Sequence, residues 1–383
     1  MSAASLPRRT ALVVAAGLLA SSAWPAFADP GHGKDRGKKK GHGKTVSAPV
    51  EDFCSGGGAA RPLQLRVDGQ VATGLYAVPK GRAKGLVVYA HGYGHTVESW
   101  RKHLTNTAAR DGVIAVAMNY RGEIISPPEK GKTLPTSRGW QVREGAADSN
   151  AAAQLIERRC SGLKTIVLYG ISMGGNTAGL ALAAKPTRAN GSPLYDYWFQ
   201  MEGAANVIET YVGARALKGS GNKTAVNAVE DIEREMGGTF ESKSSVYAEH
   251  AVVNRVDDIA ASGVKGVVLM HGVGDGLVPY NQSRELHALL LDAGLPAEMH
   301  TFLTRGASSE PGTTLDGYVT GNVPGYTSPF AGHASEASET HILNIAGFSR
   351  LSEVLGGAAP DCAEYAVDGT TGQRYYAASQ GVC

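Results

Sequence analysis

Residues Lys164–Asn176 constrain the fold of this chain more than any other segment. An apolar stretch, Thr165–Tyr169, has the composition of a buried strand and runs into the pattern Gly170-Ile-Ser-Met-Gly174. Beyond it, alanines and leucines recur at a helical spacing. A strand, a sharp turn and a helix hold the central residue, Ser172, in a strained backbone with its hydroxyl pointing outward. Glycines at 170 and 174 leave room for the turn. The segment therefore predicts that Ser172 is a nucleophile.

Apolar runs bounded by turns alternate with helical stretches along much of the chain. A half-exposed antiparallel hairpin is expected where apolar and polar residues alternate, over 63–67 and 71–78. Further strands are expected at 85–90, 113–120, 165–169, 195–201, 264–270 and 297–303, and helices near 98–111, 141–159, 173–185, 281–293 and 334–354. This alternation predicts an α/β fold with a mostly parallel central sheet and helices on both faces.

Two insertions interrupt this alternation. Residues 203–262 are helical and polar enough to form a small cap. Residues 305–332 are rich in Gly, Pro, Ser and Thr and predict a long loop.

The first 50 residues differ in composition from the rest. Residues 1–28 read as an export signal, with Arg8-Arg9, an apolar stretch and an Ala26-Phe-Ala28 cleavage site; the export route stays open. Residues 29–50 are a basic Gly/His/Lys linker that we expect to be disordered and to give at most weak adhesion to a cell wall. We expect a catalytic domain at 51–358 and a tail at 359–383, in a secreted protein with no stable membrane insertion. Because residues 51–383 carry 29 Lys and Arg against 33 Asp and Glu, we expect no nucleic-acid partner.

Four cysteines in an exported chain predict two disulfides. Three pairings are possible among Cys54, Cys160, Cys362 and Cys383. We favour Cys54 with Cys160 and Cys362 with Cys383, because the second bridge is then local to the tail.

A serine nucleophile needs a histidine to take its proton and a carboxylate to orient that histidine. In an α/β sheet with this elbow the three follow one another as serine, acid and histidine. Asp275 directly follows an expected strand and is the preferred acid, with Glu202 as its rival. His333 lies in a loop before the last expected helix and is the preferred histidine, and His341, inside that helix, is its rival.

Backbone N–H donors must face the oxyanion that forms on the substrate. Met173 follows the nucleophile, and Tyr93 lies in His91-Gly-Tyr-Gly94 after an expected strand, so these two are the candidate donors. Trp140 is a candidate substrate-binding residue. We expect His91 to brace its loop, no metal site at His91, His95 and His103, and no cofactor.

These segments together resemble the α/β-hydrolase superfamily, with closest similarity to dienelactone-hydrolase-like and prolyl-oligopeptidase-like members. The resemblance rests on His91–Gly94, Asn119–Gly122, Gly170–Gly174, the run from His271 through Asp275 to Pro279, and Gly332-His333. No β-propeller is expected, because the first strand begins at Leu63. The resemblance implies a serine hydrolase, and we expect small or polymeric carboxylic esters to be its substrates. The alternatives are a peptidase for short peptides and a non-catalytic wall-associated binding protein with this fold.

Overall fold

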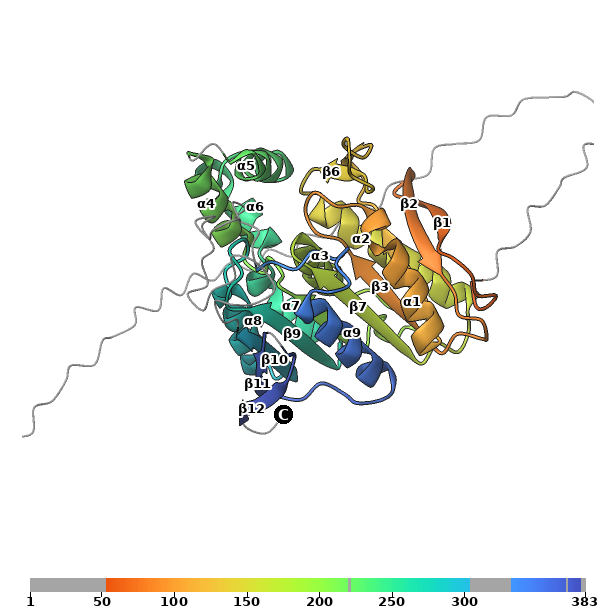
Figure 1. Cartoon of the computed structure of the whole chain (residues 1–383). Helices are drawn as coiled ribbons and strands as arrows, with labels where there is room; N and C mark the ends of the chain where they lie inside the picture. Colours follow the sequence, from red (N-terminus) through yellow and green to blue (C-terminus); the bar gives the residue numbers. More distant parts are fainter. Residues whose placement is uncertain (1–52, 220–221, 304–331, 370, 380–383) are drawn as a thin grey trace, which may run out of the picture. The chain divides into compact units, whose positions relative to one another are not determined.

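The central β-sheet of the computed structural model holds ten strands in the part of the chain that it describes, residues 53–219, 222–303, 332–369 and 371–379. Their order across the sheet is β1-β2-β4-β3-β7-β8-β9-β10-β11-β12 (Figure 1). The sheet is parallel from β4 to β11, and β1, β2 and β12 pair antiparallel. The bounds are β1 Arg61–Val67, β2 Gln70–Ala77, β3 Gly85–Ala90, β4 Ile114–Met118, β7 Thr165–Ile171, β8 Tyr197–Met201, β9 Gly266–Gly272, β10 Ala297–Leu303, β11 Ala363–Asp368 and β12 Arg374–Ser379.

Helices cover both faces of this sheet, which confirms the predicted fold class. Along β3, Leu86 and Val88 join the core under α2, α3 and α8, whereas Val87 and Tyr89 join the core under α1 and α9. This division follows from the alternation of side chains along a strand. The helices are α1 Arg101–Asp111, α2 Val142–Arg159, α3 Met173–Ala183, α4 Val207–Lys218, α5 Lys223–Met236, α6 Phe240–His250, α7 Val256–Ala261, α8 Asn281–Asp292 and α9 Ile342–Leu355, with 3-10 turns at Val97–Trp100 and Val252–Arg255.

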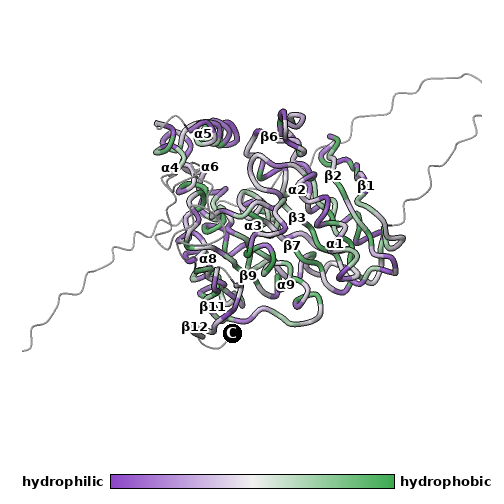
Figure 2. Tube along the Cα trace, in the orientation of Figure 1, coloured by the Kyte–Doolittle hydropathy of each residue, from purple (hydrophilic) through white to green (hydrophobic). Residues whose placement is uncertain are grey.

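Three helices, α4, α5 and α6, lie between β8 and β9 in the chain, in the segment for which a cap was expected, and are called the cap helices below (Figure 1). They pack on one another around the rings of Tyr211 and Tyr247, whose centroids are 5.0 Å apart. Hydrophobic segments concentrate along the central strands, whereas α5 is largely hydrophilic (Figure 2). Among the helices that the structure describes, none combines the length and the apolarity needed to cross a membrane.

The structure adds elements that the sequence pattern did not predict. A small hairpin of β5 Ile124–Ser126 and β6 Thr136–Arg138 follows β4. Part of the tail joins the sheet, because β11 pairs with β10 and β12 with β11. The last helix begins at Ile342 instead of near 334, and the side chain of His341 caps it by accepting the N–H of Leu343. The predicted export signal, the basic linker and nearly all of the loop at 305–332 lie outside the described residues.

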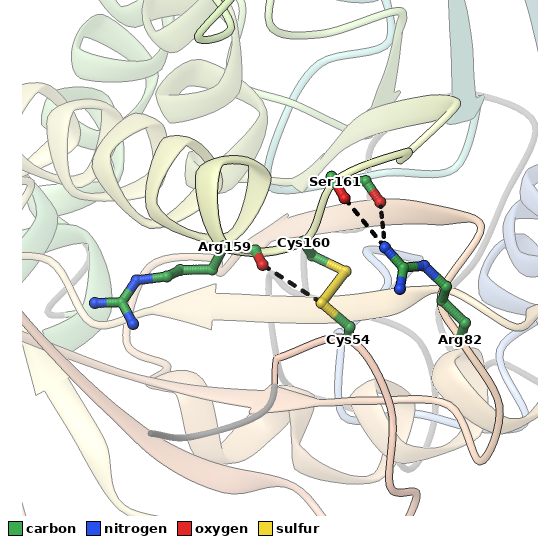
Figure 3. The surroundings of a disulfide bond; sticks show 5 residues. All are labelled: Cys54, Arg82, Arg159, Cys160 and Ser161. Atoms are coloured by element: carbon green, nitrogen blue, oxygen red, sulfur yellow. Dashed lines mark hydrogen bonds between the residues drawn. A yellow bond between two sulfur atoms is a disulfide. The ribbon is translucent and has the colours of Figure 1, made fainter. Parts of the chain in front are cut away.

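The disulfide between Cys54 and Cys160 confirms one predicted pair (Figure 3). It joins the segment before β1 to the end of α2, with a Cα–Cα distance of 5.3 Å and a sequence separation of 106. Beside it, the guanidinium of Arg82 donates to the backbone carbonyl and to the hydroxyl of Ser161, both at 3.1 Å. Cys362 is also disulfide-bonded, and its predicted partner Cys383 lies outside the described residues.

Candidate active site

Ser172 occupies a strained turn between β7 and α3. Its φ and ψ of 57° and −126° are unusual for a residue with a side chain. The flanking glycines are required by close backbone contact. A Cβ at Gly170 would lie 2.1 Å from the carbonyl oxygen of Gly174, and one at Gly174 would lie 2.1 Å from that of Ala90. The local backbone thus has the form that the glycine spacing predicted.

The backbone of this turn is tied to the end of β8. The N–H of Ser172 donates to the carbonyl of Met201 at 3.0 Å, and its own carbonyl accepts from Ala204 at 3.0 Å. These bonds place Ser172 beside Glu202, the residue after β8. They also compensate for part of the backbone strain, which costs about 1–3 kcal/mol at such a residue.

Asp275 lies in the loop after β9 and is buried. Its Oδ1 accepts the N–H groups of Leu277 at 2.8 Å and Val278 at 2.9 Å, which fixes the carboxylate. Its Oδ2 accepts a 2.6 Å hydrogen bond from Nδ1 of His333. Burial acts to raise a carboxyl pKa, but His333 and His271 hold the pKa of Asp275 well below its usual range. Asp275 is therefore ionised and oriented toward one imidazole.

His333 lies in the segment before α9, and the structure brings it to Asp275 as the sequence analysis expected. Burial acts to lower the pKa of its imidazole, but the carboxylates of Asp275, Glu202 and Glu336 together raise it to about 9. Its second nitrogen, Nε2, is buried and has no hydrogen-bond partner among the described residues. Hence one side of the ring is held by Asp275, and the other carries an unpaired nitrogen.

The rival residues have other contacts. Glu202 lies 3.5 Å from Nδ1 of His333, further than Asp275, so Asp275 makes the hydrogen bond. His341 is the N-cap of α9. The imidazole of His91 stacks on Tyr120 with ring centroids 4.0 Å apart, and burial lowers its pKa to about 4. The ring of His91 is therefore neutral and packs against Tyr120.

The two candidate oxyanion donors belong to different elements. Met173 is the first residue of α3, where backbone N–H groups have no partner within the helix. Tyr93 follows β3, and its hydroxyl donates to Oδ2 of Asp231 in cap helix α5 at 2.6 Å. Trp140 is buried, and its ring centroid lies 5.8 Å from that of Tyr93. It therefore supports Tyr93 from the core side.

Glu336 is a buried residue of the site that the sequence analysis missed. Its Oε1 accepts the N–H of Gly92 at 2.9 Å. A Cβ built on Gly92 would lie 3.3 Å from Oε2 of Glu336 and 3.3 Å from Cβ of Ser172, so this glycine lies against both residues. Only its position three residues after His333 could have drawn attention to Glu336, and such spacing has no meaning outside a helix.

Glu202, Asp275 and His333 are also, among the described residues, the one group of three acidic, histidine or cysteine side chains close enough to share an ion. The distances fit proton sharing better. The 2.6 Å between Nδ1 of His333 and Oδ2 of Asp275 is that of a charge-assisted hydrogen bond. Oxygens of both acids already accept backbone N–H groups. We therefore assign no metal to these residues.

Asp231 links the cap to the loop of Tyr93. Its carboxylate is buried and accepts hydrogen bonds from Tyr93, from Nε and Nη2 of Arg138, from the N–H of Gly139 and from Arg234.

Asp231→Ala should lower the free energy of unfolding by about 3 kcal/mol, because it leaves several donors without an acceptor. It should also reduce turnover by releasing Tyr93. Thermal melts and kcat for Asp231→Ala measure both effects. Glu230→Ala, on the same helix and half exposed, is the control, and an equal loss in both variants would contradict this role.

Comparison with known proteins agrees with this architecture. Residues 85–191 match the family model described as alpha/beta hydrolase fold. No curated protein matches the chain in sequence. A puromycin hydrolase structure is 14% identical, with a TM-score of 0.50 over 82% of this chain and 40% of that one. A variant of the esterase rPPE is 12% identical, with a TM-score of 0.51, and the match covers 79% of this chain and 84% of the esterase.

Longer peptidases also appear among the similar structures. An acylaminoacyl peptidase of Pyrococcus horikoshii is 15% identical, with a TM-score of 0.49, and this chain covers 43% of its length. At such identities the likeness concerns the fold alone. The strand order, the strained turn at Ser172 and the family match show that this chain has the α/β-hydrolase fold.

Proposed function

We propose that this protein is a secreted serine hydrolase that cleaves carboxylic esters through an acyl-enzyme, with Ser172, His333 and Asp275 as its triad. One observation carries the proposal. The hydrogen bond between His333 and Asp275 lies at the carboxyl edge of the sheet, where the strained turn presents Ser172. Ser172 follows β7 and Asp275 follows β9, so both lie at the edge where α/β sheets bind ligands, and His333 is bonded to Asp275 there.

Acylation begins when Oγ of Ser172 attacks the ester carbonyl carbon and Nε2 of His333 takes its proton. Asp275 stabilises the resulting imidazolium through Nδ1. The N–H groups of Tyr93 and Met173 are proposed to donate to the oxyanion. The tetrahedral intermediate then collapses, the ester C–O bond breaks, and the leaving alkoxide receives the proton from Nε2. An acyl group remains on Ser172.

Deacylation repeats these steps with water. Nε2 of His333 accepts a proton as the water oxygen attacks the acyl carbonyl, and it returns that proton to Oγ of Ser172 as the carboxylic acid leaves. His333 must therefore be neutral at the start of each half-reaction.

The surroundings of Ser172 support an uncharged substrate. A peptidase that recognises a free amino terminus needs a carboxylate presented to it. The acids around Ser172, namely Glu202, Asp275 and Glu336, are buried and accept backbone N–H groups. Within the described residues, these carboxylates thus already accept hydrogen bonds from the protein's own backbone. A peptidase for short peptides remains the second candidate, because amides react by the same chemistry.

A matched pair of substrates separates these two functions. We expect a nitrophenyl ester to have a far higher kcat/KM than the nitroanilide with the same acyl group, and a series of acyl chain lengths would define the pocket. A higher kcat/KM for aminoacyl or peptidyl anilides would favour the peptidase. Binding without turnover of either substrate would favour the non-catalytic alternative.

Secretion is part of the proposal. The Cys54–Cys160 disulfide supports it, since structural disulfides persist in oxidising compartments. Cleavage after Ala28 in the exported protein, read by N-terminal sequencing, is the expected result. Weak wall adhesion through residues 29–50 would be lost when that segment is deleted.

The pH dependence of kcat/KM should follow the proton on His333. If His333 had the ordinary histidine pKa, activity would be lost below about pH 6. The structure moves this limit upward, because Asp275, Glu202 and Glu336 raise the pKa of His333 to about 9. The protonated imidazole cannot accept the serine proton, so activity should rise with pH above 6.5, reach half of its maximum near pH 9 and level off only above that pH. A midpoint at or below pH 6.5 would contradict this electrostatic account.

A further inference from the structure

The second acid beside His333 has a place of its own in the site. Glu202 is fully buried, and its two oxygens accept from different segments. Oε1 accepts the N–H of Gly272 at the end of β9, at 3.1 Å, and Oε2 accepts the N–H of Ala334 at 2.6 Å. Because Ala334 directly follows His333, one carboxylate joins the strand that leads to Asp275 with the segment that carries the histidine.

The backbone around Glu202 is built to hold this position. Its φ of +43° makes it, with Ser172, one of four non-glycine residues with positive φ in the described chain. Such strain persists only where the surroundings enforce it, and it concentrates at functional sites. The next residue is Gly203, where a Cβ would lie 1.7 Å from the Gln200 side chain. A Cβ at Gly272 would lie 3.0 Å from Oε1 of Glu202, so that glycine gives the carboxylate its space.

We propose that Glu202 is a positioning residue that holds the His333 segment against the end of β9 and shares with Asp275 the stabilisation of the His333 imidazolium. This inference rests on the proposed serine-hydrolase function. Glu202 acts through His333 and touches no reacting atom. Its carboxylate lies 3.5 Å from Nδ1, close enough for its charge to act on the ring.

The charged and titratable groups around Glu202 come from three segments. They are Asp275 and His271 at the end of β9 and in the loop after it, His333 before α9, and Glu336, whose charge also acts on His333. His271 is held by Ser283 and the carbonyl of Val278, at 2.7 Å and 2.9 Å. Burial, with the charge of Asp275, raises the pKa of Glu202 to about 7, so Glu202 is ionised in the alkaline range where His333 loses its proton.

Two variants separate charge from position. Glu202→Gln keeps the size of the side chain but removes the charge, and its amide cannot accept both N–H groups in the same way. We expect the acid limb of kcat/KM to move down by about 1 pH unit. The limiting kcat should fall on the order of tenfold or more, with KM nearly unchanged. Glu202→Asp keeps the charge, so its acid limb should stay closer to that of the wild type even if kcat falls.

The deciding measurement needs no substrate. The pKa of His333 is read by NMR titration of its ring nitrogens in the wild-type, Glu202→Gln and Glu202→Asp proteins. A lower His333 pKa in the Gln variant alone supports the proposal, and an unchanged pKa in folded Glu202→Gln overturns it. Glu298→Gln is the matched control, since Glu298 is buried but contacts His300 on β10 and Arg350 on α9. Because this titration does not require ester turnover, it separates failure of this inference from failure of the proposed function.

Discussion

Replacing Ser172 by alanine should reduce kcat about 10⁵-fold or more while the protein stays folded. The reason is chemical, since alanine has no oxygen to form the acyl-enzyme. Only the donors facing the oxyanion and substrate binding would remain to accelerate attack by water. The strained backbone at 172 tolerates alanine as it tolerates serine, because both have a Cβ and neither is branched.

The measurement is single-turnover and steady-state kinetics with a nitrophenyl ester. Ser149→Ala is the matched control, because Ser149 is also buried and its hydroxyl has no partner among the described residues. That variant should keep nearly full activity. A Ser172→Ala protein within tenfold of the wild type would remove Ser172 from the mechanism.

The second large effect is expected at His333. His333→Ala should lower kcat by about 10⁴-fold or more, because no other group would take the proton of Ser172. His341→Ala should cost about 1 kcal/mol of stability through loss of the α9 cap and should leave kcat within a few-fold. Kinetics and thermal melts of the two variants check this contrast. The opposite ranking of their kcat values would show that the proposed histidine is wrong.

The sheet could be predicted from sequence because its signals are local. Strands β3 and β10 have the bounds that their apolar runs predicted, and the glycines around Ser172 predicted its strained turn. The short strands β5 and β6 were missed because three residues carry no recognisable periodicity. The start of α9 was placed too early because residues 334–341 include alanine and glutamate, which favour helices, while the actual cap is His341.

The contacts within the site could be predicted only in part. The pairing of Asp275 with His333 could be predicted because chain order and strand ends restrict the choice. The positions of Glu202, Glu336 and Asp231 depend on hydrogen bonds that span sequence separations of 132, 244 and 138, respectively. No local pattern encodes such contacts. The electrostatic consequence, a histidine surrounded by three acids, therefore emerges only from the folded chain.

Covalent labelling of the nucleophile tests the central claim most directly. The protein is treated with a fluorophosphonate, which phosphonylates activated serines, and its peptides are mapped by mass spectrometry. The account predicts one adduct per chain, on Ser172, with labelling that is strongly slowed in His333→Ala and unaffected in His341→Ala. A folded, soluble protein that takes no label, or takes it at a serine other than Ser172, would contradict the account.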